Sequence, residues 1–315
     1  MKFKTLKLFL TYSSCSAVIA SGLFFNLCRN KSNDFSDFVY EFSEDIDDDG
    51  FLVAAHRGHC DNFVENTSEA FANAADSNLV DFIEIDVRLT DDDELVVVHN
   101  NSVTKVDGND LRISSSCSDD ILNSNYVYFS ADDLKNFLSS FCNDSEGRLI
   151  RERFHSTFGK NYCIPSLKNA FDKCGGKPIL LDLKFKNDFD RFEKMLFKFL
   201  DSCSYDGEII LQSADLESLK KLQCLHPEYS YLAIVNSEDD FEKCDSFNML
   251  GVRKNLVGHW RTIDALYSGK RISVWTINSS DELSDVNSSL GKYGDDVIYV
   301  TDYPKMISAV LSKTK

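Results

Sequence analysis

DFIEIDVRL, residues 81–89, combines a nearly continuous apolar run with two carboxylates, Glu84 and Asp86. Apolar runs of this length are typical of strands that are buried on both faces, as in a parallel sheet. Because side chains alternate along a strand, the two carboxylates point to the same side, opposite to Ile83 and Ile85. The stretch therefore predicts a strand whose carboxylates face an enclosed interior or its rim.

Seven further apolar stretches follow the same strand pattern, and helical periodicity separates several of them. Such β–α alternation indicates a parallel sheet covered by helices, and eight strands predict a closed (β/α)8 barrel, the TIM barrel, with a doubly wound sheet as the main rival. A weaker ninth strand candidate, FNMLGV, covers residues 247–252. The eight strands are predicted at 52–58, 81–89, 94–100, 178–184, 208–213, 231–235, 272–278 and 296–302. The helices are predicted at 68–78, 191–203, 215–225 and 261–269.

Residues 1–30 differ from the rest of the chain. A basic start with three lysines precedes an apolar run at 8–28, which predicts a signal peptide or an uncleaved membrane anchor. Small residues before Ser21 fit a cleavage site, so we expect an exported protein, periplasmic or extracellular, or one attached to the membrane through 8–28. The polar, acidic stretch 31–50 is interpreted as a linker to a folded body at 51–315.

The composition narrows the possible partners and cofactors. The chain has 315 residues, 43% of them hydrophobic, and a formal net charge of -17, which argues against nucleic acid as a partner. Eight of its ten cysteines lie beyond residue 30 without a CxxC pair, so a structural zinc site is not expected. In an exported protein these cysteines could form disulfides or remain buried thiols. The sequence does not indicate an oligomeric state.

Polar side chains follow four consecutive predicted strands near their carboxyl ends. His56 and Arg57 end the first, the two carboxylates lie in the second, His99 ends the third, and Asp182 and Lys184 end the fourth. In a parallel barrel these ends converge on one mouth, where catalytic groups are found. Each residue alone is more often structural, as a core ion pair or a hydrogen-bonded histidine. The set on consecutive strands favours a functional site.

These motifs, in this order, resemble the glycerophosphodiester phosphodiesterase family. The resemblance rests on HRG, ENT, the Glu-x-Asp strand, TDDDELVVVHN, IPSLKNAF, LDLK, VWTIN and VTDYP, at 56–58, 65–67, 84–86, 90–100, 164–171, 181–184, 274–278 and 300–304. It extends from about residue 51 nearly to the C-terminus. The resemblance implies a TIM barrel with an inserted segment after the third strand. Here the insertion would be the stretch at about 101–162, which lacks a strong strand–helix repeat.

The resemblance also implies roles for individual residues. Glu84, Asp86 and Asp182 would hold a divalent cation, Ca²⁺ or Mg²⁺, since hard cations prefer oxygen ligands. His56 would accept a proton and His99 would donate one, although the chemistry of imidazole alone allows the reverse assignment. The substrate would be contacted by Arg57, Lys184, Glu65 and Trp275.

Four positions depart from the family pattern. Val64 replaces a proline and Asp93 a turn glycine, which concerns the loops alone. Asn100 replaces an aspartate after the second histidine and removes a possible partner for it. Asp182 replaces a metal-binding glutamate with a side chain one methylene shorter, which bears on metal position and affinity.

The reaction expected from the resemblance is hydrolysis of a glycerophosphodiester to sn-glycerol 3-phosphate and an alcohol. The substrate would be a small-molecule or lipid-derived phosphodiester. Two alternatives remain open at the level of sequence. The diester could instead be a lysophospholipid, a phosphoinositol or a glycerol-phosphate polymer of the cell envelope, or the barrel could bind such a ligand without turning it over.

Overall fold

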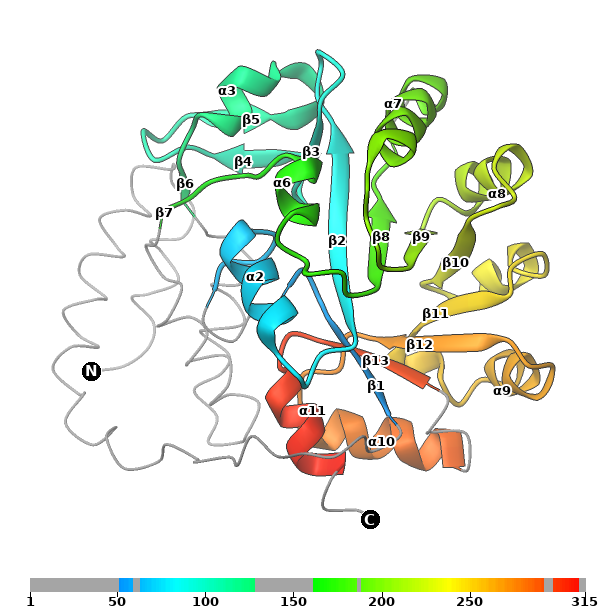
Figure 1. Cartoon of the computed structure of the whole chain (residues 1–315). Helices are drawn as coiled ribbons and strands as arrows, with labels where there is room; N and C mark the ends of the chain where they lie inside the picture. The colour runs from blue at the N-terminus through cyan, green and yellow to red at the C-terminus, as the bar shows by residue number, and fades with distance from the viewer. Residues whose placement is uncertain (1–50, 59–62, 128–160, 186–187, 292–296, 312–315) are drawn as a thin grey trace, which may run out of the picture. The chain divides into compact units, whose positions relative to one another are not determined.

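The computed structural model describes residues 51–58, 63–127, 161–185, 188–291 and 297–311 (Figure 1). The predicted export segment at 1–30, the predicted linker at 31–50 and residues 128–160 of the predicted insertion lie outside the described residues. In the part of the chain that is described, no helix has both the length and the apolar character needed to cross a bilayer.

Eight parallel strands form a closed barrel, which confirms the predicted fold class. β1 pairs with β13 on one side and with β2 on the other, so the ring has no open edge. The strands follow one another around the ring as β1 (Leu52–Ala55), β2 (Phe82–Leu89), β8 (Ile179–Leu183), β9 (Ile209–Ser213), β10 (Ser230–Val235), β11 (Met249–Arg253), β12 (Arg271–Trp275) and β13 (Val297–Thr301).

Helices lie outside the strands that they follow (Figure 1). Several begin at a Ser, Thr or Asp whose side chain accepts a hydrogen bond from a backbone N–H of the first turn, as at Thr67, Asp188 and Asp215. Such caps satisfy donors that have no partner within the helix. Apart from one short helix in the insertion, the α-helices of the described residues are α2 (Ser68–Asp76), α6 (Leu167–Phe171), α7 (Phe189–Ser202), α8 (Leu216–Leu225), α9 (Trp260–Tyr267), α10 (Ser280–Leu290) and α11 (Pro304–Leu311). The 3-10 helices η3 (Glu238–Lys243) and η4 (Lys254–Leu256) lie in the loops after β10 and β11.

The alternation of side chains along the strands creates two separate apolar layers. The layer inside the barrel is small and includes Phe82, Leu180 and Met249. The layer between barrel and helices is much larger and includes Ile83 and Ile85. Polar side chains that point inward at the carboxyl ends of the strands therefore have the inner apolar layer below them. The outer apolar layer surrounds them.

The third predicted strand is not part of the barrel. Residues of β3 (Leu95–Val97) pair antiparallel with β2, and the weaker candidate at 247–252 supplies the eighth barrel strand as β11. The apolar run misleads because both faces of β3 are buried: Leu95 and Val97 pack in the layer beneath the helices, and Val96 packs in a third core. Burial on both faces produces the same sequence pattern as a parallel barrel strand.

The third core belongs to the described part of the insertion. Its buried residues come from β3 and from the chain after it, and they are Val96, Val98, Val103, Leu111, Ile113, Ile121, Tyr126 and Ile164. The elements around it are β4 (Ser102–Thr104), β5 (Asp110–Arg112), η2 (Ile113–Ser115), α3 (Ser118–Leu122), β6 (Tyr126–Val127) and β7 (Asn161–Tyr162). β4 pairs with β5 and β6 with β7, both antiparallel.

Candidate active site

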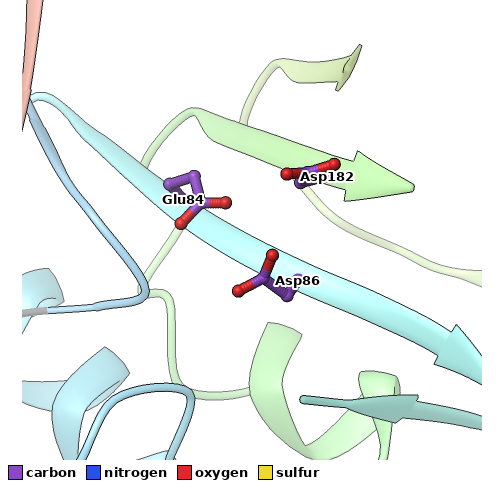
Figure 2. A group of neighbouring side chains, drawn as sticks. All are labelled: Glu84, Asp86 and Asp182. Atoms are coloured by element: carbon purple, nitrogen blue, oxygen red, sulfur yellow. The ribbon is translucent and has the colours of Figure 1, made fainter. Parts of the chain in front are cut away.

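Three carboxylates lie together inside the mouth of the barrel. Glu84 and Asp86 point to the same side of β2, and Asp182 faces them from the neighbouring strand β8 (Figure 2). Asp86 and Asp182 are register partners in the parallel pairing of β2 with β8. One oxygen from each of the three side chains lies within 4.8 Å of the other two, and the residues are only 3%, 1% and 6% exposed.

Two cations surround this cluster of carboxylates. Lys184 Nζ lies 2.9 Å from Asp86 Oδ1 and 2.5 Å from Asp182 Oδ2. The Arg57 side chain donates from Nη1 to Glu65 Oε1 at 2.7 Å, and its Nε lies 3.2 Å from Asp86 Oδ2. The Arg57 backbone N–H donates to Glu84 Oε2 at 2.7 Å. Paired charges of opposite sign make the burial of so many ionisable groups tolerable.

The three carboxylates differ in their affinity for protons. Burial, followed by the charges of Asp86 and Asp182, raises the pKa of Glu84 well above its ordinary value. Burial also raises the pKa of Asp182, against the opposing effect of Lys184. For Asp86, burial is outweighed by Lys184 and Arg57, which lower its pKa. Burial therefore opposes ionisation of Glu84 and Asp182, whereas the two neighbouring cations favour ionisation of Asp86.

The donor set fits a divalent cation such as Ca²⁺ or Mg²⁺. Within the described ranges, two buried oxygens of the cluster, Asp86 Oδ1 and Asp182 Oδ1, have no hydrogen-bond partner. Asp86 Oδ1 still has Lys184 Nζ at 2.9 Å as an ion-pair partner, so Asp182 Oδ1 is the less satisfied of the two. A buried carboxylate oxygen without a donor is costly, and a cation would compensate it. Oxygen-only ligands match the preference of hard cations.

His56 is held by a carboxylate that immediately follows the last strand of the barrel, β13. Its Nδ1 lies 2.7 Å from Asp302 Oδ1, and its backbone N–H donates to the carbonyl of Thr301 at 2.9 Å. Asn278 donates from Nδ2 to Asp302 Oδ2 at 2.8 Å and accepts the Asp302 N–H on its Oδ1 at 3.0 Å. Both oxygens of Asp302 thus have partners, which fixes its orientation toward His56.

His99 is held differently, by the adjacent Asn100 and by Arg88 of β2. Its Nδ1 lies 3.0 Å from Asn100 Oδ1, so the amide at this position supplies the acceptor that an aspartate would have supplied. Arg88 Nε donates to the His99 carbonyl at 2.8 Å. Burial lowers the pKa of His99, while the charge of Asp86 opposes this effect. These interactions place His99 within electrostatic reach of the carboxylate cluster.

The loop before α2 connects Arg57 to the carboxylates. Asn66 is buried, donates from Nδ2 to Asp86 Oδ2 at 2.8 Å and accepts the Asp86 N–H at 3.2 Å. Its φ of 56° lies in the left-handed region, which asparagine tolerates better than most residues. The Asn66 N–H also donates to the Arg57 carbonyl at 2.8 Å. The loop therefore fixes the backbone of Arg57 and the carboxylate of Asp86 together.

The structure brings Arg57, Glu65, Glu84, Asp86, Asp182 and Lys184 into one network of contacts. Trp275 lies apart from this network: its indole Nε1 donates to the Gly251 carbonyl at 2.8 Å, and its ring packs against the apolar layer inside the barrel. Tyr162 of the insertion lies within electrostatic range of Glu65: burial raises the pKa of Tyr162, and the Glu65 charge raises it further.

Three residues of this site carried no role in the sequence analysis. They are Asn66, which orients Asp86, and the pair Asn278 and Asp302, which orients His56. Each lies in a motif that already stands out in the sequence: ENT, VWTIN and VTDYP, respectively. The sequence shows that these polar residues lie next to apolar strands. It does not show their roles, because the residues that they contact belong to other parts of the chain.

Comparison with known proteins agrees with this geometry. Residues 56–305 match the model of the glycerophosphoryl diester phosphodiesterase family. A glycerophosphodiester phosphodiesterase of Caldanaerobacter subterraneus is 27% identical over 179 residues, which span 56% of this chain and 63% of that relative. The Bacillus subtilis protein YhdW is 23% identical over 263 residues, 81% of this chain and 96% of its own length.

Solved structures share the fold. An Oleispira antarctica phosphodiesterase, in complex with the product sn-glycerol-3-phosphate, superposes with a TM-score of 0.62 at 19% identity, over 83% of this chain and 96% of its own. A Parabacteroides distasonis glycerophosphodiester phosphodiesterase superposes with a TM-score of 0.63 at 18% identity, over 84% and 99%. The family match spans most of the chain and includes every residue of the site, so this chain belongs to the glycerophosphoryl diester phosphodiesterase family.

Proposed function

We propose that this protein is a metal-dependent phosphodiesterase that hydrolyses glycerophosphodiesters to sn-glycerol 3-phosphate and an alcohol. The observation that carries the proposal is the cluster of Glu84, Asp86 and Asp182, bordered by Arg57 and Lys184, in the mouth of a barrel of this family. A phosphodiester is an anion that resists attack, so its hydrolysis requires neutralisation of charge together with proton transfer at two oxygens.

Binding of the phosphate is assigned to Arg57 and Lys184. A guanidinium can bind two phosphate oxygens at once, and an ammonium adds a point charge. Glu65 holds Arg57 Nη1, so its role is to position the guanidinium. Both cations are shared with carboxylates, which keeps them in place before a substrate arrives.

His56 is assigned as the general base. A carboxylate at Nδ1 stabilises the imidazolium that forms when the imidazole takes a proton from the nucleophile, and Asp302 occupies that position. The proton would be taken through Nε2, because Nδ1 is engaged with Asp302.

His99 is assigned as the general acid that gives a proton to the leaving alkoxide. Its partner Asn100 is uncharged and stabilises an imidazolium less than a carboxylate does. Burial lowers the pKa of His99, which makes its protonated form the stronger acid. A bound phosphodiester anion would favour the protonated state before the transfer. The two partners, Asp302 and Asn100, thus support opposite roles for the two histidines.

A divalent cation would be held by Glu84, Asp86 and Asp182. When bound, it supplies positive charge next to the phosphate oxygens and a Lewis acid for the reaction. Asp86 is oriented for this role by Asn66, and the unsatisfied Oδ1 of Asp182 is available as a ligand. The choice between Ca²⁺ and Mg²⁺ depends on the number of ligands and on their flexibility.

The test is turnover of defined diesters by the full-length protein. Glycerophosphoethanolamine is incubated with the protein in EDTA, in Ca²⁺ and in Mg²⁺, and release of sn-glycerol 3-phosphate is followed with a coupled dehydrogenase. We expect product in at least one metal and none in EDTA. A protein that binds the diester but forms no product from this diester, from lysophospholipids or from bis(p-nitrophenyl) phosphate at any metal concentration would be a binding domain instead.

We further propose that the protein is exported, with residues 1–30 as signal peptide or membrane anchor. The support is the basic start followed by the apolar run at 8–28. Fusion of residues 1–50 to a reporter that is active only outside the cytoplasm tests this proposal. The size of the mature protein then shows whether the segment is cleaved.

A further inference from the structure

Arg253 ends β11 at the mouth of the barrel, on the wall opposite the carboxylate cluster. Around the ring of eight strands, β11 lies four strands from β2 in either direction. Parallel strands end on the same side of a barrel, so Arg253 and the residues at the carboxyl end of β2 border the same opening. Its pairing partner is Trp275, the last residue of β12.

The alternation along β11 directs Arg253 inward. Met249 packs in the layer inside the barrel, whereas Leu250 and Val252 pack in the layer beneath the helices. A Cβ added at Gly251 would lie 2.7 Å from Leu232 Cδ2, which belongs to the inner layer. Because side chains two apart share a face, Arg253 continues the inward row of Met249 and Gly251 at its upper end.

Among the residues that the structure describes, the guanidinium of Arg253 has no anionic partner. Within the described ranges, Arg253 forms neither an ion pair nor a side-chain hydrogen bond, and it is exposed. Its neighbour Lys254, by contrast, is paired with Glu282, and Arg57 and Lys184 are paired with the carboxylates of the site. A chain with a net charge of -17 repels anions overall, so an unpaired cation beside the mouth has a local effect on which substrates bind.

We propose that Arg253 is a specificity residue that recognises an anionic group on the alcohol part of the diester. The inference rests on the proposed diester hydrolysis. With the phosphate held near Arg57 and Lys184, an arm of the substrate that crosses the mouth approaches β11 and β12. Trp275 Nε1 donates to the Gly251 carbonyl, so the indole is held beside this path. Arg253 then offers a fork of N–H donors suited to a carboxylate or a second phosphate.

Two diesters that differ by one carboxylate test this assignment. Glycerophosphoserine has the amine of glycerophosphoethanolamine and one additional carboxylate. We expect Arg253→Gln to lower kcat/KM for glycerophosphoserine by about tenfold to a hundredfold, the range of a charge-assisted hydrogen bond. For glycerophosphoethanolamine we expect less than about a twofold change, because that arm offers Arg253 no anion. Arg253→Lys should retain part of the preference, since it keeps the charge but not the fork.

The matched control is Arg271→Gln, which removes the same charge. Arg271 is exposed and begins β12, so it lies at the opposite end of the barrel. It should leave both kcat/KM values unchanged. Melting temperatures close to that of the wild type for both variants show that folding is intact.

The outcomes separate this inference from the proposed function. If the wild-type protein turns over neither diester, the proposed function fails and this inference with it. If the wild type turns over both, but Arg253→Gln affects them equally or not at all, the Arg253 assignment alone is overturned. The same comparison is made with lysophosphatidylserine and lysophosphatidylethanolamine. If Arg253→Gln also lowers kcat/KM selectively for the serine lysophospholipid, the substrate is lipid-derived. If the selective loss is confined to the two water-soluble diesters, the substrate is the free diester, and either result supports the role of Arg253.

Discussion

His56 Nδ1 and Asp302 Oδ1 lie 2.7 Å apart, although 246 positions separate the two residues in the chain. They meet because β1 and β13 are neighbours in the closed ring, with Ala55 paired to Thr301. Each of these strands is followed immediately by one member of the pair. Closure of the barrel therefore assembles the contact that orients the proposed general base.

Asp302→Asn should lower kcat at least about tenfold, as removal of an outer partner of a functional histidine usually does. The amide keeps the shape of the side chain but cannot stabilise an imidazolium by charge. KM should change little, because Asp302 contacts His56 rather than the proposed phosphate-binding cations. Steady-state kinetics check this, with Asp264→Asn on the exposed face of α9 as the control. Equal activity of both variants would remove Asp302 from the mechanism.

His56→Ala and His99→Ala should each lower kcat by about two orders of magnitude or more, the scale of general acid–base groups. A nitrophenyl ester has a leaving group that departs without a proton, so it should partly restore the rate of the variant that lacks the acid. We expect this rescue for His99→Ala and not for His56→Ala. Rescue of His56→Ala instead would exchange the two roles, and near-wild-type turnover of either variant would exclude the two-histidine mechanism.

A divalent cation should stabilise the fold through the carboxylate cluster. At a metal concentration about 100 times Kd the expected gain in the free energy of unfolding is about 2.7 kcal/mol. Melting curves in EDTA and in Ca²⁺ or Mg²⁺ measure this gain. Asp182→Asn should lose most of it together with activity, whereas Asp182→Glu should keep it, since the longer carboxylate restores the family residue. A wild type that neither shifts in melting temperature nor loses activity in EDTA would contradict the metal site.

The metal-induced rise in melting temperature should increase with pH. Burial, followed by Asp86 and Asp182, raises the pKa of Glu84 in the metal-free protein. The stabilisation that protonated Glu84 contributes is present at low pH and is lost as the pH rises through this raised pKa. A cation requires the ionised carboxylate, so it competes with the proton at low pH and binds more tightly at high pH. Melting curves with and without metal between about pH 5 and pH 8 measure the trend. A pH-independent difference would argue against Glu84 as a ligand.

The cysteines should divide into two reactivity classes. Burial raises the pKa of Cys174 to about 12, and burial, followed by Asp240, raises that of Cys244 to about 12. Cys117, Cys163 and Cys224 are exposed free thiols. Because the thiolate is the reactive form, iodoacetamide at about pH 8 should label the exposed group and spare the buried pair until the protein is denatured. Peptide mass spectrometry reads the labelling, and labelling of Cys174 in the native protein would contradict the packing around it.

The sequence by itself determined the barrel class and the face of β2 that carries the carboxylates. These features depend on patterns within one strand: the apolar run at 81–89 predicts a buried strand, and the spacing of Glu84 and Asp86 places both on one side. The alternation of side chains is a property of the extended backbone, so it does not depend on contacts with distant parts of the chain.

Only the tertiary structure decided the direction of β3 and the partners of His56 and Asp86. The apolar run of β3 is buried between the helix-covered layer and the core of the insertion, and burial on both faces does not distinguish an antiparallel strand from a barrel strand. β11 replaces it in the ring. Asp302 contacts His56 because closure of the ring brings the last strand beside the first. Asn66 contacts Asp86 because the segment before α2 packs against β2. These contacts join residues far apart in the chain, and their free energy depends on packing that the sequence pattern does not record.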